Sequence, residues 1–159
     1  MATGTPATAT LTRASIPFTL HPYDHDPRST AFGDEAAAVL GIDPEQIFKT
    51  LIVSVDGSLA CAVVPVAQRL DLKAFAGAIG AKRAELADPS AAARATGYVV
   101  GGISPIGQKT TLPVILDETI ELFDTVYVSA GRRGLQVELS PSDLARATGA
   151  RIALIATSR

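Results

Sequence analysis

Lys49 is the first residue whose position suggests chemistry. The stretch 47–55 is predicted to form a β-strand, and side chains alternate between the two faces of a strand. Lys49 therefore shares a face with the apolar Leu51 and Val53. An ammonium group among apolar side chains costs free energy unless it reaches water, an anion or a polar pocket. Two interpretations stay open: a lysine that extends to solvent, or a cation directed into a ligand pocket.

A second candidate is the glycine-rich segment 96–109. Its apolar run, Tyr98-Val99-Val100, leads into Gly101 and Gly102. Glycine allows positive φ and a close approach to a ligand, so such a loop can present backbone N–H groups to an anion or an oxyanion. An ordinary glycine-proline turn is the alternative.

The same segment excludes two common catalytic motifs. Gly102 and Gly107 have the spacing of a phosphate-binding P-loop, but Gln108 stands where that motif requires lysine. Ser104 lacks the G-x-S-x-G context of a serine nucleophile, and Pro105 follows it. We therefore expect Ser104 to hydrogen-bond within a turn of the substrate site.

Other reactive side chains have simpler explanations. His21 and His25 are four residues apart, but prolines interrupt any helix there, so we expect no metal site. Cys61 alternates with apolar residues and is predicted to be a small core residue. Arg132, at a predicted hairpin tip, could bind a phosphate group or be solvated. The sequence shows no convincing pair of protein nucleophile and base.

Composition limits the class of protein. The chain has 159 residues, of which 47% are hydrophobic, so it can form one compact domain with a core. We expect a flexible tail at 1–10 and a single domain at 11–159. Its net charge of −2 excludes a general basic surface for nucleic acid, so any RNA would be bound locally or with a partner. One cysteine and no long apolar run predict a cytoplasmic protein that does not span a membrane.

The elements that would position these residues alternate irregularly between strand and helix. Asp56-Gly57 predicts a hairpin between two long strands, and Gly131 to Arg133 predicts a second one. Hairpins without a long βα repeat favour a single α+β domain. Strands are expected at 16–21, 47–55, 58–66, 82–86, 112–116, 125–129, 134–139 and 151–156, and helices at 34–40, 70–79, 89–94 and 144–148, with a helical turn at 118–123.

Five short motifs occur in a fixed order along the chain. Together they resemble the YbaK family of bacterial aminoacyl-tRNA deacylases, which is related to the editing insertion domain of prolyl-tRNA synthetase. The resemblance covers roughly residues 11–156. The motifs are Phe32-Gly-Asp-Glu35, Phe48-Lys-Thr-Leu51, Leu70-Asp-Leu-Lys73, Thr96-Gly-Tyr98 followed by Gly101-Gly-Ile-Ser-Pro105, and Val128-Ser-Ala-Gly-Arg-Arg-Gly134.

The resemblance implies a fold and an activity. The fold would be a twisted, mixed, mainly antiparallel sheet, partly barrel-like, with surrounding helices. The activity would be hydrolysis of mischarged Cys-tRNA(Pro), and also of Cys-tRNA(Cys), in trans to prolyl-tRNA synthetase. That synthetase and the acceptor end of tRNA(Pro) would be the partners, and no cofactor would be needed.

The resemblance also assigns residues. Lys49 matches the family's essential pocket lysine, and Gln136 replaces an aspartate found in some members. From the residue types we expect the Gly101 and Gly102 amides to act as oxyanion donors, and Lys49 to hold the 3′-terminal phosphate or ribose of the tRNA in preference to acting as a general base. The residues expected to bind substrate are Tyr23, Phe32, Tyr98, Ser104, Ser129, Arg132 and Gln136.

The family mechanism needs no protein nucleophile, because the substrate's own cysteine thiol is proposed to attack the ester. The enzyme would then mainly position reacting groups. Two alternatives stay open: removal of another amino acid such as alanine from tRNA(Pro), or a non-catalytic module that binds the synthetase or the tRNA end.

Overall fold

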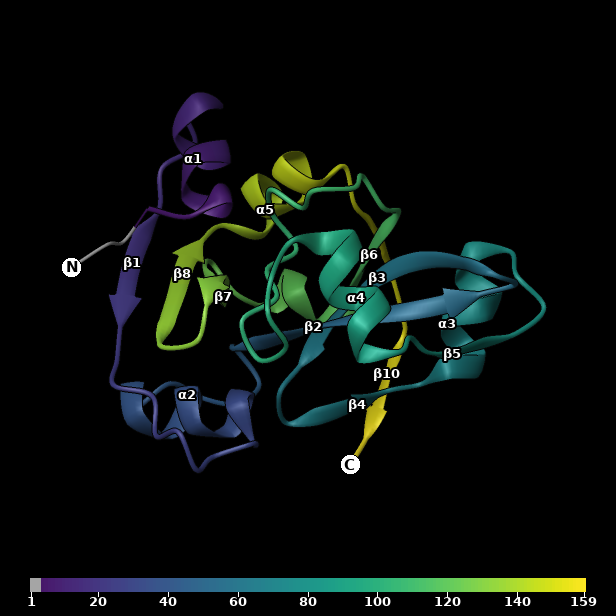
Figure 1. Ribbon diagram of the computed structural model, residues 1–159, viewed down its shortest axis with the longest axis horizontal. Helices are drawn as coiled ribbons and strands as arrows, with labels where there is room; N and C mark the ends of the chain where they lie inside the picture. Colours follow the sequence, from purple (N-terminus) through teal and green to yellow (C-terminus); the bar gives the residue numbers. More distant parts are fainter. Residues whose placement is uncertain (1–3) are drawn as a thin grey trace.

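The computed structural model describes residues 4–159, which fold into three β-sheets surrounded by helices (Figure 1). None of the helices in this range is long and apolar enough to cross a membrane. The elements are α1 (Pro6–Arg13), β1 (Thr19–Pro22), α2 (Phe32–Leu40), β2 (Phe48–Val55), β3 (Ser58–Pro65), β4 (Gln68–Leu70), α3 (Leu72–Ile79), β5 (Ala84–Leu86), α4 (Pro89–Thr96), β6 (Val114–Asp117), the 3-10 helix η1 (Glu118–Leu122), β7 (Val126–Arg132), β8 (Leu135–Leu139), α5 (Pro141–Thr148), β9 (Arg151–Ala153) and β10 (Ala156–Ser158).

The largest sheet has five strands in the order β5-β2-β3-β6-β9. Its centre is the predicted hairpin of β2 and β3, which turns at Asp56 and Gly57, both with positive φ. Strand β3 then pairs in parallel with β6, and β6 with β9, so the sheet is mixed. One face of the hairpin packs Val53 and Val55 toward Phe75 of α3.

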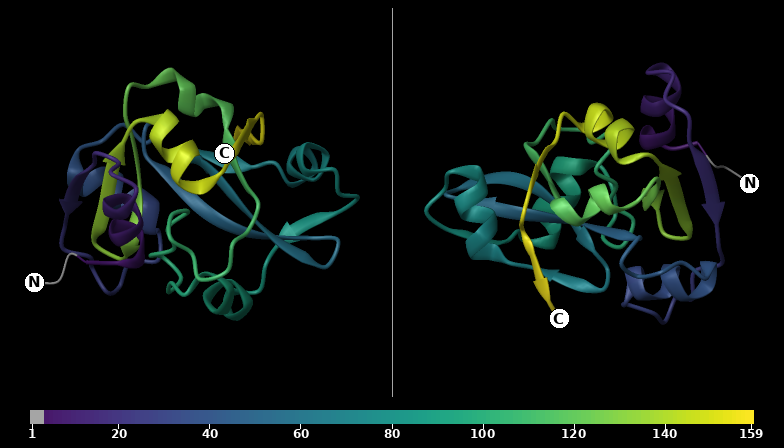
Figure 2. Two further views of the ribbon diagram at one scale, coloured as in Figure 1. Left: turned by 90° about the horizontal axis from the view of Figure 1, so that it is seen from above. Right: turned by 180° about the vertical axis from the view of Figure 1, so that it is seen from behind.

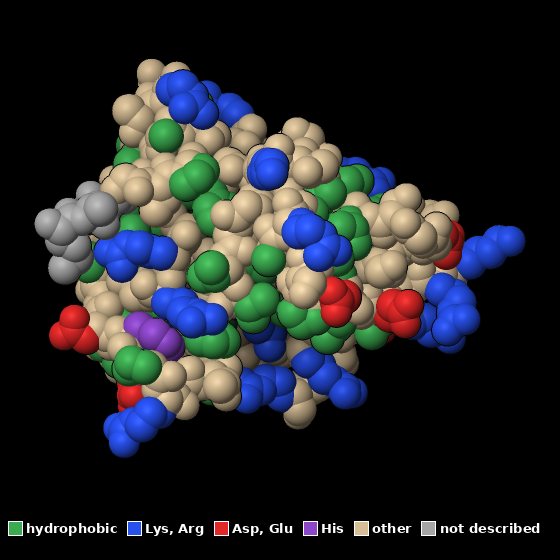
Figure 3. Space-filling view, viewed as in Figure 1, with side chains coloured by type: hydrophobic (Ala, Val, Ile, Leu, Met, Phe, Trp, Pro, Cys, Tyr) green, Lys and Arg blue, Asp and Glu red, His purple; other side chains and the backbone are tan. Residues whose placement is uncertain are grey.

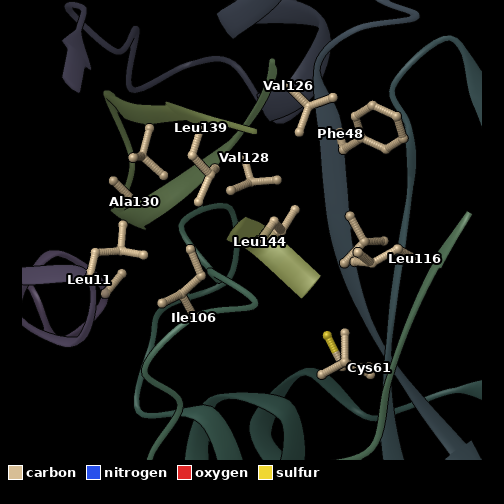
Figure 4. Close-up of a cluster of buried hydrophobic side chains, with 14 of the residues drawn as sticks. Leu11, Phe48, Cys61, Ile106, Leu116, Val126, Val128, Ala130, Leu139 and Leu144 are labelled. Atoms are coloured by element: carbon tan, nitrogen blue, oxygen red, sulfur yellow. The ribbon is translucent and has the colours of Figure 1, made fainter. Parts of the chain in front are cut away.

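The second sheet, β1-β8-β7, is antiparallel and packs against the other face of the hairpin. Between the two sheets lies the main core, where Phe48 of β2 and Leu116 of β6 face Val126 and Val128 of β7 (Figure 4). Figure 2 shows that the two sheets are inclined to each other. The predicted mixed, mainly antiparallel α+β fold is confirmed.

The expected barrel-like closure is not complete. Within residues 4–159, the strand pairing that joins the first two sheets is a single isolated β-bridge between Ile47 and Tyr127. The sheets therefore stay open along one edge of β2, and that open edge becomes one wall of the candidate site.

The expected final strand 151–156 is in fact two strands in different sheets. Strand β9 pairs with β6, whereas β10 pairs with β4. The buried Asp117 separates them, because its carboxylate accepts hydrogen bonds at 2.9 Å from the backbone N–H groups of both Ile155 and Ala156. The chain turns at this carboxylate and leaves the large sheet.

The expected flexible tail 1–10 is wrong for its second half. Helix α1 begins at Pro6, and Thr5 caps it through a capping box with Thr8. Ala7 and Leu11 of this helix are fully buried in the main core, which explains why the segment is ordered. Residues 1–3 lie outside the described residues.

Candidate active site

A cavity of about 510 Å³ lies along the open edge of β2, at Phe48 to Ile52. Strand β5 pairs only with Val53 to Val55, so it leaves the first half of β2 uncovered. The Ile52 carbonyl accepts a hydrogen bond from Ala87 N–H at the point where β5 ends. Because backbone direction repeats every two residues, we expect the N–H and C=O of Thr50 to point toward the same open edge.

Lys49 lies in the lining of this cavity and is partly buried. Burial lowers the pKa of its ammonium, the positive charge of Arg159 lowers it further, and Asp34 opposes both effects. Within residues 4–159 the Lys49 ammonium has no recorded ion-pair partner. The structure therefore places a cation with unused hydrogen-bonding capacity at the cavity wall.

The charges around Lys49 are mainly positive. Arg69 and Arg159 also line the cavity, and Asp34 is the acidic residue of the lining. Arg159 donates to the Asp34 carboxylate at 3.0 Å, and that pair largely cancels. Lys49 and Arg69 remain, so the cavity favours an anionic ligand. Sequence reasoning missed Arg69, Asp34 and Arg159, because only the fold brings them beside Lys49.

The glycine loop forms the opposite wall at Gly101. A Cβ atom on Gly101 would lie 2.7 Å from the Phe32 ring, so the ring packs directly on the glycine. Arg133 lies 4.9 Å over the same ring and donates to the Val100 carbonyl from Nε at 2.9 Å and from Nη2 at 2.6 Å. The loop is thus held from two distant parts of the chain.

The two adjacent glycines differ in what their amides can do. The Gly102 N–H donates to the Val99 carbonyl at 2.9 Å, so it cannot also serve as the expected oxyanion donor. For Gly101, no N–H hydrogen bond to another residue in 4–159 is recorded. Gly101 lines the cavity and stays the candidate oxyanion donor, whereas the Gly102 amide is already engaged.

Ser129 and Gln136 face each other on β7 and β8 and both line the cavity. The Ser129 hydroxyl donates to the Gly102 carbonyl at 3.0 Å. Gln136 has an exposed fraction of only 8%, and its Oε1 has no hydrogen-bond partner in the described part of the chain. Thr50 Oγ1, on β2, is likewise buried and has no hydrogen-bond partner in the described part of the chain. Both oxygens are available to a polar ligand group.

Tyr23 lies outside the cavity lining, and its backbone N–H donates to the Gly134 carbonyl at 2.9 Å. Burial raises the pKa of Tyr23, and hydrogen bonds from the Gly134 backbone and the Gln136 side chain partly offset that rise. The structure therefore does not bring Tyr23 into the cavity lining, although Tyr23 interacts with Gln136, which is part of it.

Three further predicted binding residues lie away from the cavity lining. Tyr98 is buried in the core, where its hydroxyl donates to the Ile106 carbonyl at 2.6 Å and burial raises its pKa to about 12. Ser104 is fully buried and accepts the Ile106 N–H, as a turn residue does. Arg132 supplies backbone that packs on Gly102. The loop folds back onto the core, so the structure does not bring these three residues into the cavity lining.

The remaining reactive side chains do not form a second site. Each histidine pairs with a glutamate, His21 with Glu138 at 2.9 Å and His25 with Glu35 at 2.6 Å. Within residues 4–159 there is no cluster of three potential metal ligands. Cys61 is fully buried, as predicted, and burial raises its pKa to about 12, so it is not a nucleophile. The cavity lining contains neither histidine nor cysteine.

The chain is similar to known proteins. EbsC of Enterococcus faecalis, to which a Cys-tRNA(Pro)/Cys-tRNA(Cys) deacylase activity is attributed, is 40% identical over 125 residues, covering 78% of this chain and 76% of EbsC. A proline–tRNA ligase of Shouchella clausii is 32% identical over 64% of this chain, which corresponds to 18% of the ligase.

The fold also matches a solved structure. A protein assigned as a trans-editing enzyme for prolyl-tRNA synthetase superposes with a TM-score of 0.84 at 27% identity, over 99% of this chain and 100% of that one. The family model described as the aminoacyl-tRNA editing domain matches residues 25–147. The resemblance to YbaK proteins is confirmed, and the chain belongs to the aminoacyl-tRNA editing domain family.

Proposed function

We propose that this chain is an aminoacyl-tRNA deacylase that acts in trans and removes cysteine from Cys-tRNA(Pro), and also from Cys-tRNA(Cys). One observation carries the proposal. The cavity brings the Lys49 ammonium and the Gly101 amide together in a lining without cysteine or histidine. Such a site suits an ester that is already reactive and needs positioning more than a protein nucleophile.

Each group has a role in the proposed reaction. Lys49 holds the terminal phosphate or ribose of the tRNA, because a charged ammonium binds an anion and cannot act as a base. The Gly101 N–H donates to the ester oxygen as negative charge develops on it. Ser129 supports this wall through its hydrogen bond to the Gly102 carbonyl.

The nucleophile in this proposal is the substrate thiol. Its sulfur forms a bond to the ester carbonyl carbon, the bond from that carbon to the ribose oxygen breaks, and the ribose hydroxyl leaves with a proton. Water then hydrolyses the released cyclic thioester to cysteine. The buried Cys61 takes no part.

The surface supports binding of a nucleic-acid end beside a partner protein. Figure 3 shows that Lys and Arg side chains predominate on the face that carries α2 and α4, although the whole chain has a net charge of −2. This uneven distribution fits local contact with the acceptor end of tRNA, with prolyl-tRNA synthetase holding the rest. We place the activity in the cytoplasm, where tRNA is charged.

Amino-acid release from three substrates tests the proposal. Purified protein is incubated with tRNA(Pro) charged with cysteine, alanine or proline, and Lys49→Ala is the negative control. We expect release of cysteine only. Release of alanine only would replace cysteine as the substrate, and no release from any substrate would favour a non-catalytic module that binds tRNA or the synthetase.

A further inference from the structure

A β-bulge in β7 lies directly beside the cavity. The pairing of β7 with β8 shifts between Ser129 and Arg132, so Ala130 and Gly131 have no opposite residue. Gly131 has a φ of 108°, a conformation that a side chain would strain. Because Ser129 lines the cavity and precedes the bulge, the shape of the bulge sets the direction of the Ser129 side chain.

Three hydrogen bonds connect this bulge to the N-terminal helix and to the glycine loop. The Thr5 hydroxyl donates to the Ala130 carbonyl at 2.5 Å. The next amide, Gly131 N–H, donates to Ser129 Oγ at 3.2 Å. Ser129 Oγ in turn donates to the Gly102 carbonyl at 3.0 Å. The chain of bonds therefore runs from Thr5 to the residue next to Gly101.

Close packing fixes the same region sterically. A Cβ atom on Gly131 would lie 2.8 Å from the Tyr98 ring and 3.2 Å from Thr5 Cβ, and one on Gly107 would lie 2.6 Å from the Pro6 carbonyl oxygen. Leu11 of α1 points into the core beside Ala130 and Ile106 (Figure 4). Helix α1 thus packs behind both the bulge and the loop.

We propose that Thr5 is a positioning residue for the deacylation reaction. By holding the Ala130 carbonyl, its hydroxyl fixes the bulge, the direction of Ser129 and, through the Gly102 carbonyl, the place of the Gly101 N–H. Thr5 touches no substrate. The inference rests on the proposed function and adds to it a residue that lies outside both the cavity lining and the matched family region.

The two tasks of the Thr5 hydroxyl can be separated by mutation. As an acceptor, it caps α1 by receiving the Thr8 N–H at 3.1 Å. As a donor, it binds the Ala130 carbonyl. Aspartate is a good helix cap and accepts the Thr8 N–H, but an ionised carboxylate has no proton to donate. Thr5→Asp therefore keeps the cap and removes the bond to the bulge, whereas Thr5→Ser keeps both.

Steady-state deacylation of Cys-tRNA(Pro) is measured for wild type, Thr5→Asp and Thr5→Ser, with Thr8→Ala as a control that weakens the cap alone. We expect Thr5→Asp to lower kcat about tenfold with KM unchanged, since one net hydrogen bond is worth up to about a factor of ten. We expect Thr5→Ser and Thr8→Ala to stay within about twofold of wild type. Wild-type kcat in Thr5→Asp, or an equal loss in Thr8→Ala, would overturn the proposal.

Amide hydrogen exchange gives a readout that is independent of activity. In Thr5→Asp the Gly131 and Gly102 amides should exchange about tenfold faster, while the Ile52 and Val53 amides of β2 keep their wild-type rates. If wild type releases no amino acid, the proposed function fails, and these exchange rates still test the positioning role. Unchanged exchange at Gly131 and Gly102 would refute that role.

Discussion

The two walls of the cavity are built in different ways. The strand wall, defined as Phe48 to Ile52 of β2, is held by a continuous antiparallel ladder to β3. The loop wall, defined as Val100 to Ile103, belongs to no strand or helix. It is held by contacts from elsewhere, namely the Phe32 ring, the Arg133 guanidinium and the Ser129 hydroxyl.

The difference shows how each wall should respond to mutation. Backbone bonds to β3 hold the strand wall, so Lys49, which is not part of the buried core, can change with little loss of stability, whereas Phe48 and Ile52 also belong to that core. The loop wall depends on individual side-chain contacts, so changes there should affect stability and activity together. Four predictions test this distinction.

The strand wall gives the largest predicted effect on activity. Lys49→Ala should lower kcat/KM for Cys-tRNA(Pro) about a hundredfold, since it removes the charge that holds the anionic substrate. Its free energy of unfolding should stay within about 1 kcal/mol of wild type. Lys73→Ala, which removes an exposed lysine on α3, is the control and should match wild type in both measurements. Equal losses of stability and activity in Lys49→Ala would contradict the distinction.

The loop wall gives the largest predicted effect on stability. A Cβ atom on Gly102 would lie 2.8 Å from the Arg132 Cα and the Arg133 N, which are backbone atoms that cannot rotate away. Gly102→Ala should therefore lower the free energy of unfolding by about 2 kcal/mol, and kcat should fall as well.

Gly77→Ala is a matched control for that substitution. Gly77 lies within α3, and beyond its chain neighbours and the backbone of its own helix, a Cβ atom added to it would meet no atom within 4 Å. The change should stabilise the protein by about 0.5 to 1 kcal/mol because alanine favours helix. Denaturant unfolding measures the free energy of unfolding of both variants. A change of the same sign in the two would show that the stability of the loop wall does not depend on the close packing at Gly102.

Arg133 tests the loop wall through a single side chain. Arg133→Ala removes both donors to the Val100 carbonyl and the contact with Phe32, at an exposed position. We expect a loss of about 1 kcal/mol in stability and about fivefold in kcat. Arg133→Lys keeps the charge but not the paired donors, so its stability and its kcat should lie between those of wild type and Arg133→Ala. Arg83→Ala, at an exposed arginine outside the cavity lining, should behave as wild type.

The pH dependence of the strand wall is the smallest effect. Burial and Arg159 lower the pKa of Lys49, so its ammonium should deprotonate below the ordinary lysine value of about 10.4. Enzyme-catalysed deacylation, corrected for base hydrolysis of the ester, should fall as pH rises through that lowered pKa.

Stability should change in the opposite direction over the same interval. Between the lowered pKa and about 10.4, the unfolded chain binds more protons at this lysine than the folded one, so the contribution of Lys49 to stability rises with pH. Lys49→Arg keeps its charge and should lack both trends. A wild-type profile identical in shape to that of Lys49→Arg would contradict this assignment.

Local patterns in the sequence predicted much of the fold but only part of the site. The hairpin at Asp56-Gly57 was predictable because turn residues and alternation act over a few positions. Lys49 was predicted from the alternation of side chains along its strand, Phe32 and Ser129 from family motifs, and Gln136 from the aspartate that it replaces in some family members. These four residues do line the cavity.

What could not be predicted depends on contacts between distant segments. No local pattern shows that the Gly102 N–H donates to the Val99 carbonyl or that Tyr98 points into the core. Nor does one show that Arg159 forms an ion pair with Asp34. The segment 6–10 resembled a tail because its threonines and alanines are not strongly apolar, yet it belongs to a helix that Ala7 and Leu11 anchor in the core.

The open edge of β2 has a consequence for solubility. A strand edge with unpaired N–H and C=O groups can pair with the edge of another chain and begin aggregation. Here the unpaired stretch is only the first half of β2, and it contains Lys49. A charged side chain on a strand edge disfavours such pairing, because the incoming strand would have to bury it. The ammonium that suits an anionic ligand thus also keeps this edge free for that ligand.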